Sequence, residues 1–431
     1  MTLLATDRSG LLPAGAPLEI VAARSVAEVQ DTLRRAHADG IPVVTRGAGS
    51  GLAGGAVAGE GVIVLDLSGL DRILEIDAVD GVARVEPGVV TADLDRAARE
   101  RGLFYAPDPG SVGISTIGGN IATNAGGLRG AKYGVTRDAV LGLDVVLADG
   151  TLIRVGRSTI KGVTGYDLTG LIVGSEGTLG VVVGATVRLL PIPPETATAT
   201  AFFATLEQAA DAVAAIAVSG ARPAVLEIID GATLQAIDEA EGTSFRARGE
   251  AFLLAQTDGF GAERELDAIR AAVEPTASEV EWTTDPARTE LLLTARRQAL
   301  PAIERRGRVL IEDIAVPRSR LADAIRGIRA IAERTGTEIF VFGHAGDGNL
   351  HPIILIGGDA GSEIPAPAQA AANAVFELAL DYGGTLTAEH GIGLLKQGWV
   401  RAELGERVHA LHTEVKALFD PTGILNPGKA I

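Results

Sequence analysis

The sequence contains no cysteine, and this absence excludes several classes of protein at once. Without a thiol there is no disulfide, no zinc finger, no cysteine-ligated iron–sulfur cluster and no flavin attached through cysteine. No uncharged apolar run approaches the ~18 residues of a membrane helix. The first residues, MTLLATDRSGLLPAG, lack the basic start and long apolar core of a signal peptide. We therefore expect a cytoplasmic protein, with peripheral attachment to a membrane through a partner left open.

Basic residues are scarce relative to acidic ones. Lys and Arg number 38 against 55 Asp and Glu, which gives a formal net charge of −17 at pH 7. This charge disfavours non-specific binding to nucleic acid or to an anionic membrane. Glycine, in contrast, is abundant, with 55 in 431 residues, where an average share is about 7%. Many tight turns or close approaches between backbone and ligand are implied.

In the first part of the chain, helical patterns and strand patterns are both present, as is typical of an α+β fold. Residues 25–40 and 91–101 are typical of helices, with Ser25 and Thr91 as N-caps. Residues 41–45 and 62–67 are typical of strands, and 72–77 with 82–86 form a strand pair around Asp80–Gly81. Residues 141–155 predict a hairpin with Asp149–Gly150 as a two-residue turn.

A proline cluster at 191–194 is the best domain boundary, so we expect domains at 1–194 and 195–431. In the second, helical patterns alternate with strand-like ones, which suggests helices on one face of a mostly antiparallel sheet. The expected helices are 205–218, 262–273, 318–334 and 365–382. The expected strands are 224–229, 251–257, 308–316 and 338–343.

The stretch RGAGSGLAGG (46–55) contains the dinucleotide fingerprint G-x-G-x-x-G, with Asp66 downstream. A Rossmann turn must open a crossover helix, and seven residues, GAVAGEG, leave no room for one before the next strand. A hairpin loop without a ligand is the plain alternative. Five glycines in ten residues instead favour an anion nest, in which backbone N–H groups hold a pyrophosphate without a helix.

Two further polar tracts suggest one large cofactor held mainly by backbone. Residues 107–134 contain no evident run of core residues and carry small hydroxyls, amides and glycines, which would line a flat polar heteroaromatic ligand. The alternative is a long surface loop, which is uncommon in a compact domain unless it is functional. GSEGTLG (174–180) is the other tract.

The stretch FVFGHAGDGNLHPIIL (340–355) carries the clearest candidate for a metal-binding or catalytic site. If GDGN (346–349) closes a four-residue loop, His344 lies directly opposite His351, and both imidazoles share one face. This arrangement suits a divalent ion, although a hydrogen-bonded structural pair is the alternative. Glu389 and His390, in TAEHGIG, are adjacent and not expected to point the same way, so one could bind metal while the other serves as base.

Six motifs, in order along almost the whole chain, resemble the FAD-linked 2-hydroxyacid dehydrogenases of the vanillyl-alcohol-oxidase superfamily. Within it the sequence is most similar to the branch of the glycolate oxidase catalytic subunit and D-lactate dehydrogenase. The motifs are PVVTRGAGSGLAGGAV, TIGGNIATNAGGLRGAKYGVTRD, VTGYDLTGLIVGSEGTLG, FGHAGDGNLHP, TAEHGIGLLK and FDPTGILNPGK. The resemblance implies a two-subdomain FAD-binding fold of the PCMH type, then a ferredoxin-like antiparallel sheet with helices and a C-terminal helical segment that contacts FAD.

The resemblance also implies which residues meet the cofactor. Ser50 stands where some relatives carry a histidine that links the flavin, so FAD is expected to be non-covalent. The residues expected to contact FAD are Arg46, Gly47, Ala48, Gly49, Ser50, Gly51, Pro107, Thr116, Gly118, Gly119, Asn120, Thr123, Asn124, Gly126, Glu176, Gly177, Gly180 and Asn426.

For the reaction, the resemblance implies that His344, His351 and Glu389 bind zinc or manganese and that His390 is the base. Arg296 matches the arginine that binds the substrate carboxylate, with Arg297 as the second choice because Leu293 replaces a nearby tryptophan. Relatives that oxidise 2-hydroxyglutarate carry a lysine near the aspartate of VLIEDIAVP and an asparagine at the position of Ile353. Both are missing, which favours a small monocarboxylate such as D-lactate or glycolate.

Partners follow from the same reading. The sequence implies no second redox centre, so electrons are expected to pass to a quinone, a cytochrome or an iron–sulfur partner subunit, and a homodimer is considered. A redox-neutral or non-catalytic FAD-binding subunit of this fold is the alternative. A metal-dependent hydrolase is a third hypothesis, which leaves the glycine tracts unexplained.

Overall fold

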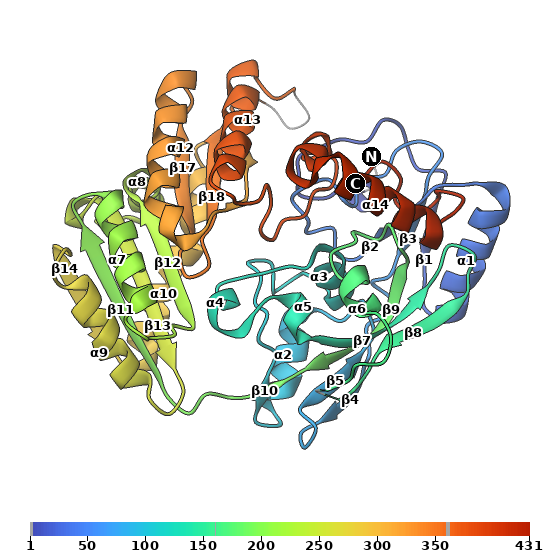
Figure 1. The fold of residues 1–431 in the computed structure, drawn as a ribbon, viewed down its shortest axis with the longest axis horizontal. Helices are drawn as coiled ribbons and strands as arrows, with labels where there is room; N and C mark the ends of the chain where they lie inside the picture. Colours follow the sequence, from blue (N-terminus) through green and yellow to red (C-terminus); the bar gives the residue numbers. More distant parts are fainter. Residues whose placement is uncertain (1–2, 160, 359–362) are drawn as a thin grey trace. The chain divides into compact units, whose positions relative to one another are not determined.

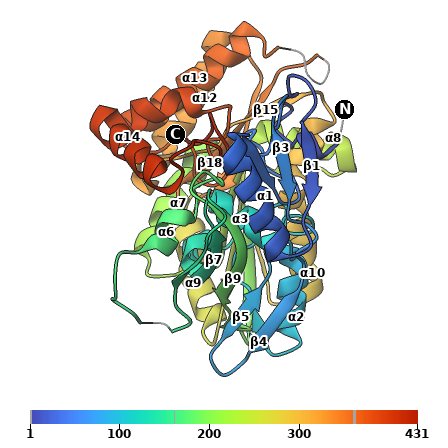
Figure 2. The ribbon, with the colours of Figure 1, turned by 90° about the vertical axis from the view of Figure 1, so that its right-hand side faces the viewer.

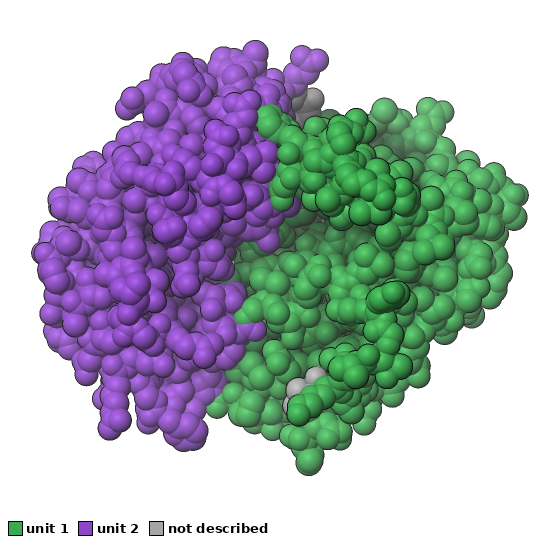
Figure 3. Space-filling view, in the orientation of Figure 1, with its two compact units in different colours: residues 1–127, 134–192, 389–431 green, residues 128–133, 193–388 purple. Residues whose placement is uncertain are grey.

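The computed structural model of the chain describes residues 3–159, 161–358 and 363–431 (Figure 1). Contacts divide it into two compact units, which Figure 3 shows in different colours. The first unit combines Met1–Gly127, Gly134–Ile192 and Glu389–Ile431. The second combines Leu128–Tyr133 with Pro193–Ala388.

The first unit begins with a small parallel sheet, in the order β1-β3-β2, backed by helix α1 (Figure 2). Buried Val29 and Leu33 of the helix pack against Ile63 and Leu65 of the central strand. Ser25 caps α1 as expected, since its side chain accepts the N–H of Glu28, and Gly40 ends it with φ +66°. The elements are η1 (Leu3–Ala5), β1 (Glu19–Ala22), α1 (Val26–Asp39), β2 (Val43–Arg46) and β3 (Ile63–Asp66).

The rest of the first unit surrounds a five-stranded antiparallel sheet, in the order β4-β5-β9-β7-β8. Its buried face holds the helices α2 and α3 through residues such as Leu94, Ile117 and Ile121. The strands are β4 (Ile73–Asp77), β5 (Val82–Val85), β7 (Val140–Val146), β8 (Leu152–Gly156) and β9 (Val181–Arg188), with the pair β6 (Leu103–Phe104) and β10 (Leu190–Pro191) beside them. The helices are α2 (Thr91–Arg99), α3 (Ile117–Thr123), α5 (Thr136–Ala139), α6 (Leu168–Ile172), η4 (Gln397–Trp399) and α14 (Val400–Phe419).

The second unit is built on one antiparallel sheet of eight strands. Its order is β14-β11-β13-β12-β17-β18-β15, and β16 also pairs with β18. The strands are β11 (Thr196–Phe203), β12 (Val225–Asp230), β13 (Ala251–Asp258), β14 (Glu279–Thr283), β15 (Val309–Ile311), β16 (Ile314–Ala315), β17 (Ile339–His344) and β18 (Asn349–Leu355).

Helices cover both faces of this sheet, so the expectation of one covered face is wrong. The four expected helices form the row α9, α7, α12, α13, and α9 packs on Ala197 and Ala199. The opposite face, with Phe202 and Ile229, is covered by α8, α10 and α11. The cause is the composition of the strands: every residue of β12 is buried, so neither face could be left to water.

The helices of the second unit have the following bounds. On the first face lie α7 (Leu206–Val218), α9 (Ala262–Val273), α12 (Leu321–Thr335) and α13 (Ala366–Asp381). The others are α4 (Gly130–Tyr133), α8 (Gly231–Glu241), η2 (Arg246–Arg248), α10 (Pro286–Arg297), α11 (Ala299–Glu304) and η3 (Arg318–Arg320). None of the helices in the described part of the chain is both long and apolar enough to cross a membrane.

Several local expectations need correction. Thr91 is the first residue of α2 rather than its cap, because its hydroxyl bonds to Ser115 in the neighbouring tract. The turn between β7 and β8 has three residues, since Leu147 N–H donates to Thr151 O and Gly150 adopts φ +80°. The strand expected at 308–316 is broken in two at Glu312 and Asp313, both buried.

Candidate active site

The glycine-rich connection after β2 contains no helix, as its sequence predicts. Residues 47–62 join two parallel strands, so the connection is neither a Rossmann turn nor a hairpin loop. Asp66 pairs in register with Arg46, and its carboxylate accepts the N–H and hydroxyl of Ser68. A ribose-binding role for Asp66 has no support in these contacts. A phosphate at this connection would be held by loop amides.

Arg46 lies beneath this loop instead of reaching outward. Its guanidinium donates to the carbonyls of Thr6 and Ala48, and burial lowers the pKa of Arg46 against the opposing charges of Asp66 and Asp7. Gly49 has φ +66°, and a β-carbon there would collide with this guanidinium. The arginine therefore shapes the loop from within.

The polar tract 107–134 packs closely against the glycine-rich loop 46–55. A β-carbon on Gly47 would collide with Thr116 Oγ1, so the close approach of the two tracts requires glycine. Thr116 also caps α3, which contains Ile117 and Ile121, both fully buried. The tract has no run of core residues, as expected, but two isoleucines four apart anchor one helical turn in the core.

Two of the expected FAD-contacting residues of this tract have evident packing roles. Asn120 is buried, and its Nδ2 donates to Thr91 Oγ1 at 2.8 Å. A β-carbon on Gly118 would lie 2.5 Å from Pro87 Cβ, so this glycine is required by packing. All the residues expected to contact FAD lie in the first unit.

The C-terminal segment closes around Glu176. This residue adopts φ +51°, and its carboxylate accepts the N–H groups of Ile392 and Gly393 at 2.7 and 2.8 Å. Burial raises the pKa of Glu176. Asn426 Nδ2 donates to the carbonyls of Gly55 and Glu176 at 3.2 and 2.6 Å. The C-terminal segment thereby connects the glycine-rich loop (46–55) to the tract GSEGTLG (174–180) by hydrogen bonds.

Asn426 also provides a test of fit for a cofactor. Its Oδ1 is buried and has no hydrogen-bond partner among the residues that the structure describes. A buried acceptor without a donor is costly, so it indicates a donor supplied by a ligand. With the bare backbone of Gly51, where a β-carbon would meet only Asp7 at 4.0 Å, these features fit a nucleotide-bearing cofactor.

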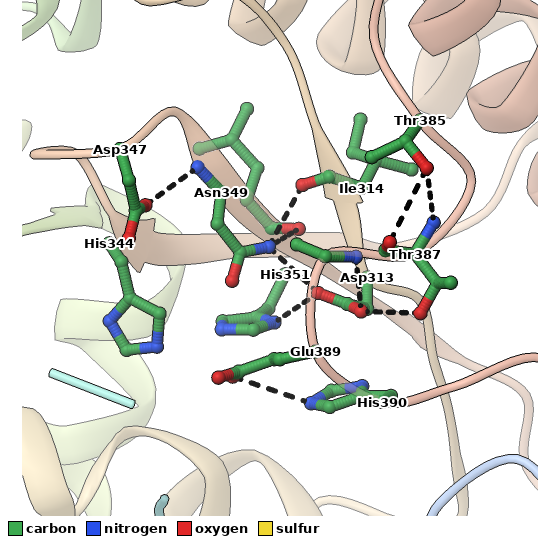
Figure 4. A network of polar contacts seen from close by, with 12 residues as sticks. Asp313, Ile314, His344, Asp347, Asn349, His351, Thr385, Thr387, Glu389 and His390 are labelled. Atoms are coloured by element: carbon green, nitrogen blue, oxygen red, sulfur yellow. Dashed lines mark hydrogen bonds and ion pairs between the residues drawn. The ribbon is translucent and has the colours of Figure 1, made fainter. Parts of the chain in front are cut away.

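Glu389 and His390 belong to the same unit. A β-carbon on Gly126 would lie 2.5 Å from Glu389 Oε2, so the absence of a side chain there makes room for this carboxylate. His390 Nε2 lies 3.7 Å from Glu389 Oε1 (Figure 4). The expectation that these adjacent side chains point apart is therefore wrong. The glycines around them allow the backbone to turn: Gly391 has φ +81°.

In the second unit, the β17–β18 hairpin has a different register from the one expected. His344 lies opposite Asn349, and His351 lies opposite Phe342. The loop is residues 345–348, because Gly348 takes φ +87° and Asn349 already belongs to the strand. The two histidines are thus diagonal neighbours on one face, with ring centroids 5.1 Å apart.

His344 and Arg296 share one buried carboxylate. Glu227, on the neighbouring strand β12, lies directly opposite His344 and is fully buried. His344 Nδ1 lies 2.7 Å from Glu227 Oε1, and Arg296 Nε donates to Oε2 at 2.5 Å. The guanidinium, at the end of α10, also lies 4.5 Å above the Phe342 ring. Because an ionised carboxylate only accepts, Nδ1 is the donor in this contact, and Nε2 is the ring nitrogen that could bind a metal ion.

His351 is supported by a second buried carboxylate, Asp313 (Figure 4). Asp313 Oδ1 lies 3.6 Å from His351 Nδ1 and accepts Asn349 Nδ2 at 2.7 Å. Its Oδ2 accepts the Thr387 hydroxyl and the Ala388 N–H, both at 2.8 Å. Asp313 therefore fixes both the hairpin and the backbone immediately before Glu389.

Sequence reasoning missed Glu227 and Asp313 as members of the site. Each had a signal: an acidic residue inside an otherwise apolar strand pattern, VLEIID and VLIEDIAVP. Buried acids are rare unless they are paired, so such positions predict a buried partner without naming it. Arg297, the second choice for substrate binding, instead pairs with exposed Glu290.

Comparisons with known proteins agree with this geometry. Residues 17–156 match the model of an FAD binding domain, and residues 192–430 match that of FAD linked oxidases, C-terminal domain. The glycolate oxidase subunit GlcD of Bacillus subtilis is 42% identical over 96% of this chain and 88% of its own. A D-lactate dehydrogenase of Archaeoglobus fulgidus is 38% identical over 94% of this chain and 89% of its own.

Solved structures show the same fold at lower identity. A p-cresol methylhydroxylase matches with a TM-score of 0.77 and 17% identity, over 99% of this chain and 91% of its own. A 4-ethylphenol oxidase from Gulosibacter chungangensis matches with a TM-score of 0.75 and 21% identity, over 95% and 88%. The expected α+β architecture, an FAD-binding fold of the vanillyl-alcohol-oxidase type followed by an antiparallel sheet with helices, is confirmed. The chain is an FAD-binding oxidoreductase and belongs to the FAD-linked oxidases.

Proposed function

We propose that this protein oxidises a small D-2-hydroxyacid, D-lactate or glycolate, to the corresponding 2-oxoacid. One observation carries the proposal: a single buried carboxylate holds Arg296 and His344 side by side. A guanidinium beside an imidazole pair suits a carboxylate next to a hydroxyl, because the guanidinium binds the first in bidentate fashion. The printed names of relatives, glycolate oxidase subunit and D-lactate dehydrogenase, support the same class of substrate.

The chain's own residues divide the work as follows. Arg296 binds the substrate carboxylate through its terminal nitrogens, since its Nε is engaged by Glu227. His390 accepts the proton of the 2-hydroxyl. His344, His351 and Glu389 would hold a divalent ion, zinc or manganese, while the first unit would hold FAD without a covalent link. Bound FAD would supply the acceptor for the C2 hydride, and a bound ion would supply Lewis-acid polarisation of the hydroxyl.

Substrate size is proposed from the surroundings of His351. Ile353 lies two residues further along the same strand face, fully buried beside Phe340. An apolar contact at this position leaves a second carboxylate without a polar partner, at an unfavourable desolvation cost. A monocarboxylate with a short chain is therefore favoured over a dicarboxylate.

The two electrons taken from the substrate would leave to a separate acceptor, for which a quinone, a cytochrome and an iron–sulfur partner subunit are the candidate classes. We place the enzyme in the cytoplasm, with or without attachment to a membrane through that partner. We also propose a domain division between residues 194 and 195, which limited proteolysis tests, and a homodimeric state, which analytical ultracentrifugation tests.

Turnover with an artificial electron-accepting dye tests the proposed reaction. Purified enzyme is supplied with D-lactate, glycolate, L-lactate and D-2-hydroxyglutarate, and the product is identified by mass. We expect pyruvate from D-lactate or glyoxylate from glycolate, at rates well above those for the L-acid and the dicarboxylate. A preference for D-2-hydroxyglutarate would contradict the assignment of substrate size.

A further inference from the structure

The carboxylate of Glu227 is in an unusual position for a buried acid. It has no exposed surface, and its two oxygens are engaged by the side chains of His344 and Arg296. Among the described residues, no backbone N–H donates to it. Most side-chain hydrogen bonds go to backbone or water, whereas both partners of Glu227 are side chains that the proposed function places at the substrate.

Asp230, on the same strand, is an internal comparison. It is also buried, but it lies on the opposite face of the sheet and accepts the backbone N–H groups of Thr233 and Val341. These bonds cap α8 and join β12 to β17. Asp230 therefore has the contacts of a structural acid, and Glu227 has those of a residue that orients functional groups.

Both partners of Glu227 are held by further contacts. Glu227 and His344 are directly opposed in the sheet, so their backbones are fixed by the strand pairing. Arg296 is held by the Nε bond and by the face of Phe342, whose strand partner is His351. One carboxylate therefore determines the separation between the Nε2 edge of His344 and the terminal nitrogens of Arg296.

We propose that Glu227 is a positioning residue that couples His344 to Arg296 and thereby selects acids whose hydroxyl is on the carbon next to the carboxylate. The inference rests on the proposed function, in which these two side chains meet the two ends of that unit. A 3-hydroxyacid has one more carbon between the two groups and cannot satisfy a fixed separation. Glu227 touches neither group of the substrate and acts through its two partners.

The chemistry of the Glu227→Gln variant separates positioning from packing. A carboxamide has nearly the same shape, but it offers one acceptor and one donor in place of two acceptors. If its N–H faces His344, the ring must accept at Nδ1 and carry its proton on Nε2, where the lone pair is lost. Loss of such a supporting contact typically weakens metal binding about 10- to 100-fold.

The experiment compares full-length wild type, Glu227→Gln, Glu227→Asp and the control Asp230→Asn, each checked for bound FAD and for its melting temperature. Zn²⁺ and Mn²⁺ affinities are measured by competition with a chromogenic chelator, and oxalate affinity by calorimetry. Flavin reduction is followed with D-lactate and with D-3-hydroxybutyrate. We expect Glu227→Gln to bind Zn²⁺ and oxalate at least ~10-fold more weakly, with FAD retained.

The outcomes are distinct. Glu227→Asp should lower the ratio of the rate of flavin reduction by D-lactate to the rate with D-3-hydroxybutyrate, because its shorter side chain moves the guanidinium. Asp230→Asn should lower the melting temperature and leave the two affinities and this ratio unchanged. Unchanged Zn²⁺ and oxalate affinities in Glu227→Gln, or equal losses in Asp230→Asn, would overturn the positioning role. If wild type oxidises no 2-hydroxyacid, the proposed function fails, while the two affinities still decide the role of Glu227.

Discussion

The Asp313 carboxylate accepts the backbone N–H of Ala388 at 2.8 Å, one residue before Glu389 and two before His390. A buried acid thus holds the last residue of the second unit, directly before the proposed metal ligand and base in the sequence. Because Asp313 also lies 3.6 Å from His351, one side chain contacts both the hairpin and residues 387–388 of the second unit.

Asp313→Ala should therefore damage activity more than FAD binding. It removes the acceptor of the Ala388 N–H, and it removes one acceptor each from Asn349 Nδ2, which keeps Ile314 O, and from the Thr387 hydroxyl. A buried group left without an acceptor costs about 1–3 kcal/mol. Small displacements at a reacting centre can cost up to about 100-fold in rate. Thr387→Val, which removes one of these bonds, should cost about 1 kcal/mol. For each variant, urea unfolding measures the stability and flavin reduction measures the activity. Equal losses in Asp313→Ala and Thr387→Val would contradict the role of Asp313 in fixing the backbone before Glu389.

His390→Ala should abolish flavin reduction by substrate while FAD remains bound. Removal of a general base typically costs about 100- to 10,000-fold, and the predicted FAD contacts do not include this side chain. His412→Ala, an exposed histidine on α14, is the control and should behave as wild type. Stopped-flow absorbance of the flavin is the measurement, and unchanged bleaching in His390→Ala would sink the assignment.

Gly47→Ala should weaken FAD binding by about 10-fold or more, equivalent to about 1.4 kcal/mol. The added methyl collides with Thr116 Oγ1 and separates the two cofactor tracts. The double variant Gly47→Ala/Thr116→Ala should recover part of the affinity, because the colliding oxygen is gone. Gly398→Ala, where a β-carbon meets nothing within 4 Å, is the control. Retention of FAD by the single variant would show that the tracts can separate without loss.

Lys429 gives a pH dependence whose sign can be stated. Its Nζ donates to the carbonyls of Gly55 and Val57, and burial lowers its pKa to about 8. Unfolded lysine titrates near ~10.4. Below pH 8 both states are charged and burial of the charge destabilises the fold. From about pH 8 to 10.4 the folded state releases the proton first, so stability rises with pH.

The comparison with Lys429→Met isolates this effect. The difference in unfolding free energy between wild type and variant should shift in favour of wild type as pH rises from 8 to 10, by at most about 1.4 kcal/mol per pH unit. Below pH 7 the difference should be constant. A difference that stays flat, or that moves toward the variant above pH 8, would show that Lys429 is not buried as a cation.

The β17–β18 hairpin shows how far the sequence alone could lead. Alternating apolar residues and the GDGN turn chemistry placed both histidines on one face, which the structure confirms. The register was wrong by one residue at each strand, because a four-residue loop can be closed from more than one position. The choice is made by contacts far away in sequence: Asn349 is held in the strand by Asp313 and Ile314.

The carboxylates of Glu227 and Asp313 could not be assigned to the site from the sequence, because their partners are distant in the sequence. Glu227 is 117 residues from His344 and 69 from Arg296, and only strand pairing brings them together. The helices α8, α10 and α11 were not among those predicted from the sequence, and α11, with only six residues, is too short to show a helical period. Local signals, such as the Ser25 cap and the helix-free glycine connection, were readable because neighbouring residues decide them.

Anaerobic stopped-flow reduction of the bound flavin by D-lactate, L-lactate and glycolate tests the central claim most directly. It measures the half-reaction itself and needs neither the electron acceptor nor its identity. We predict rapid bleaching by D-lactate or glycolate, formation of one 2-oxoacid per flavin, and no comparable bleaching by L-lactate. A flavin that stays oxidised with all three acids, in enzyme loaded with FAD and supplied with Zn²⁺ or Mn²⁺, would contradict the proposed function.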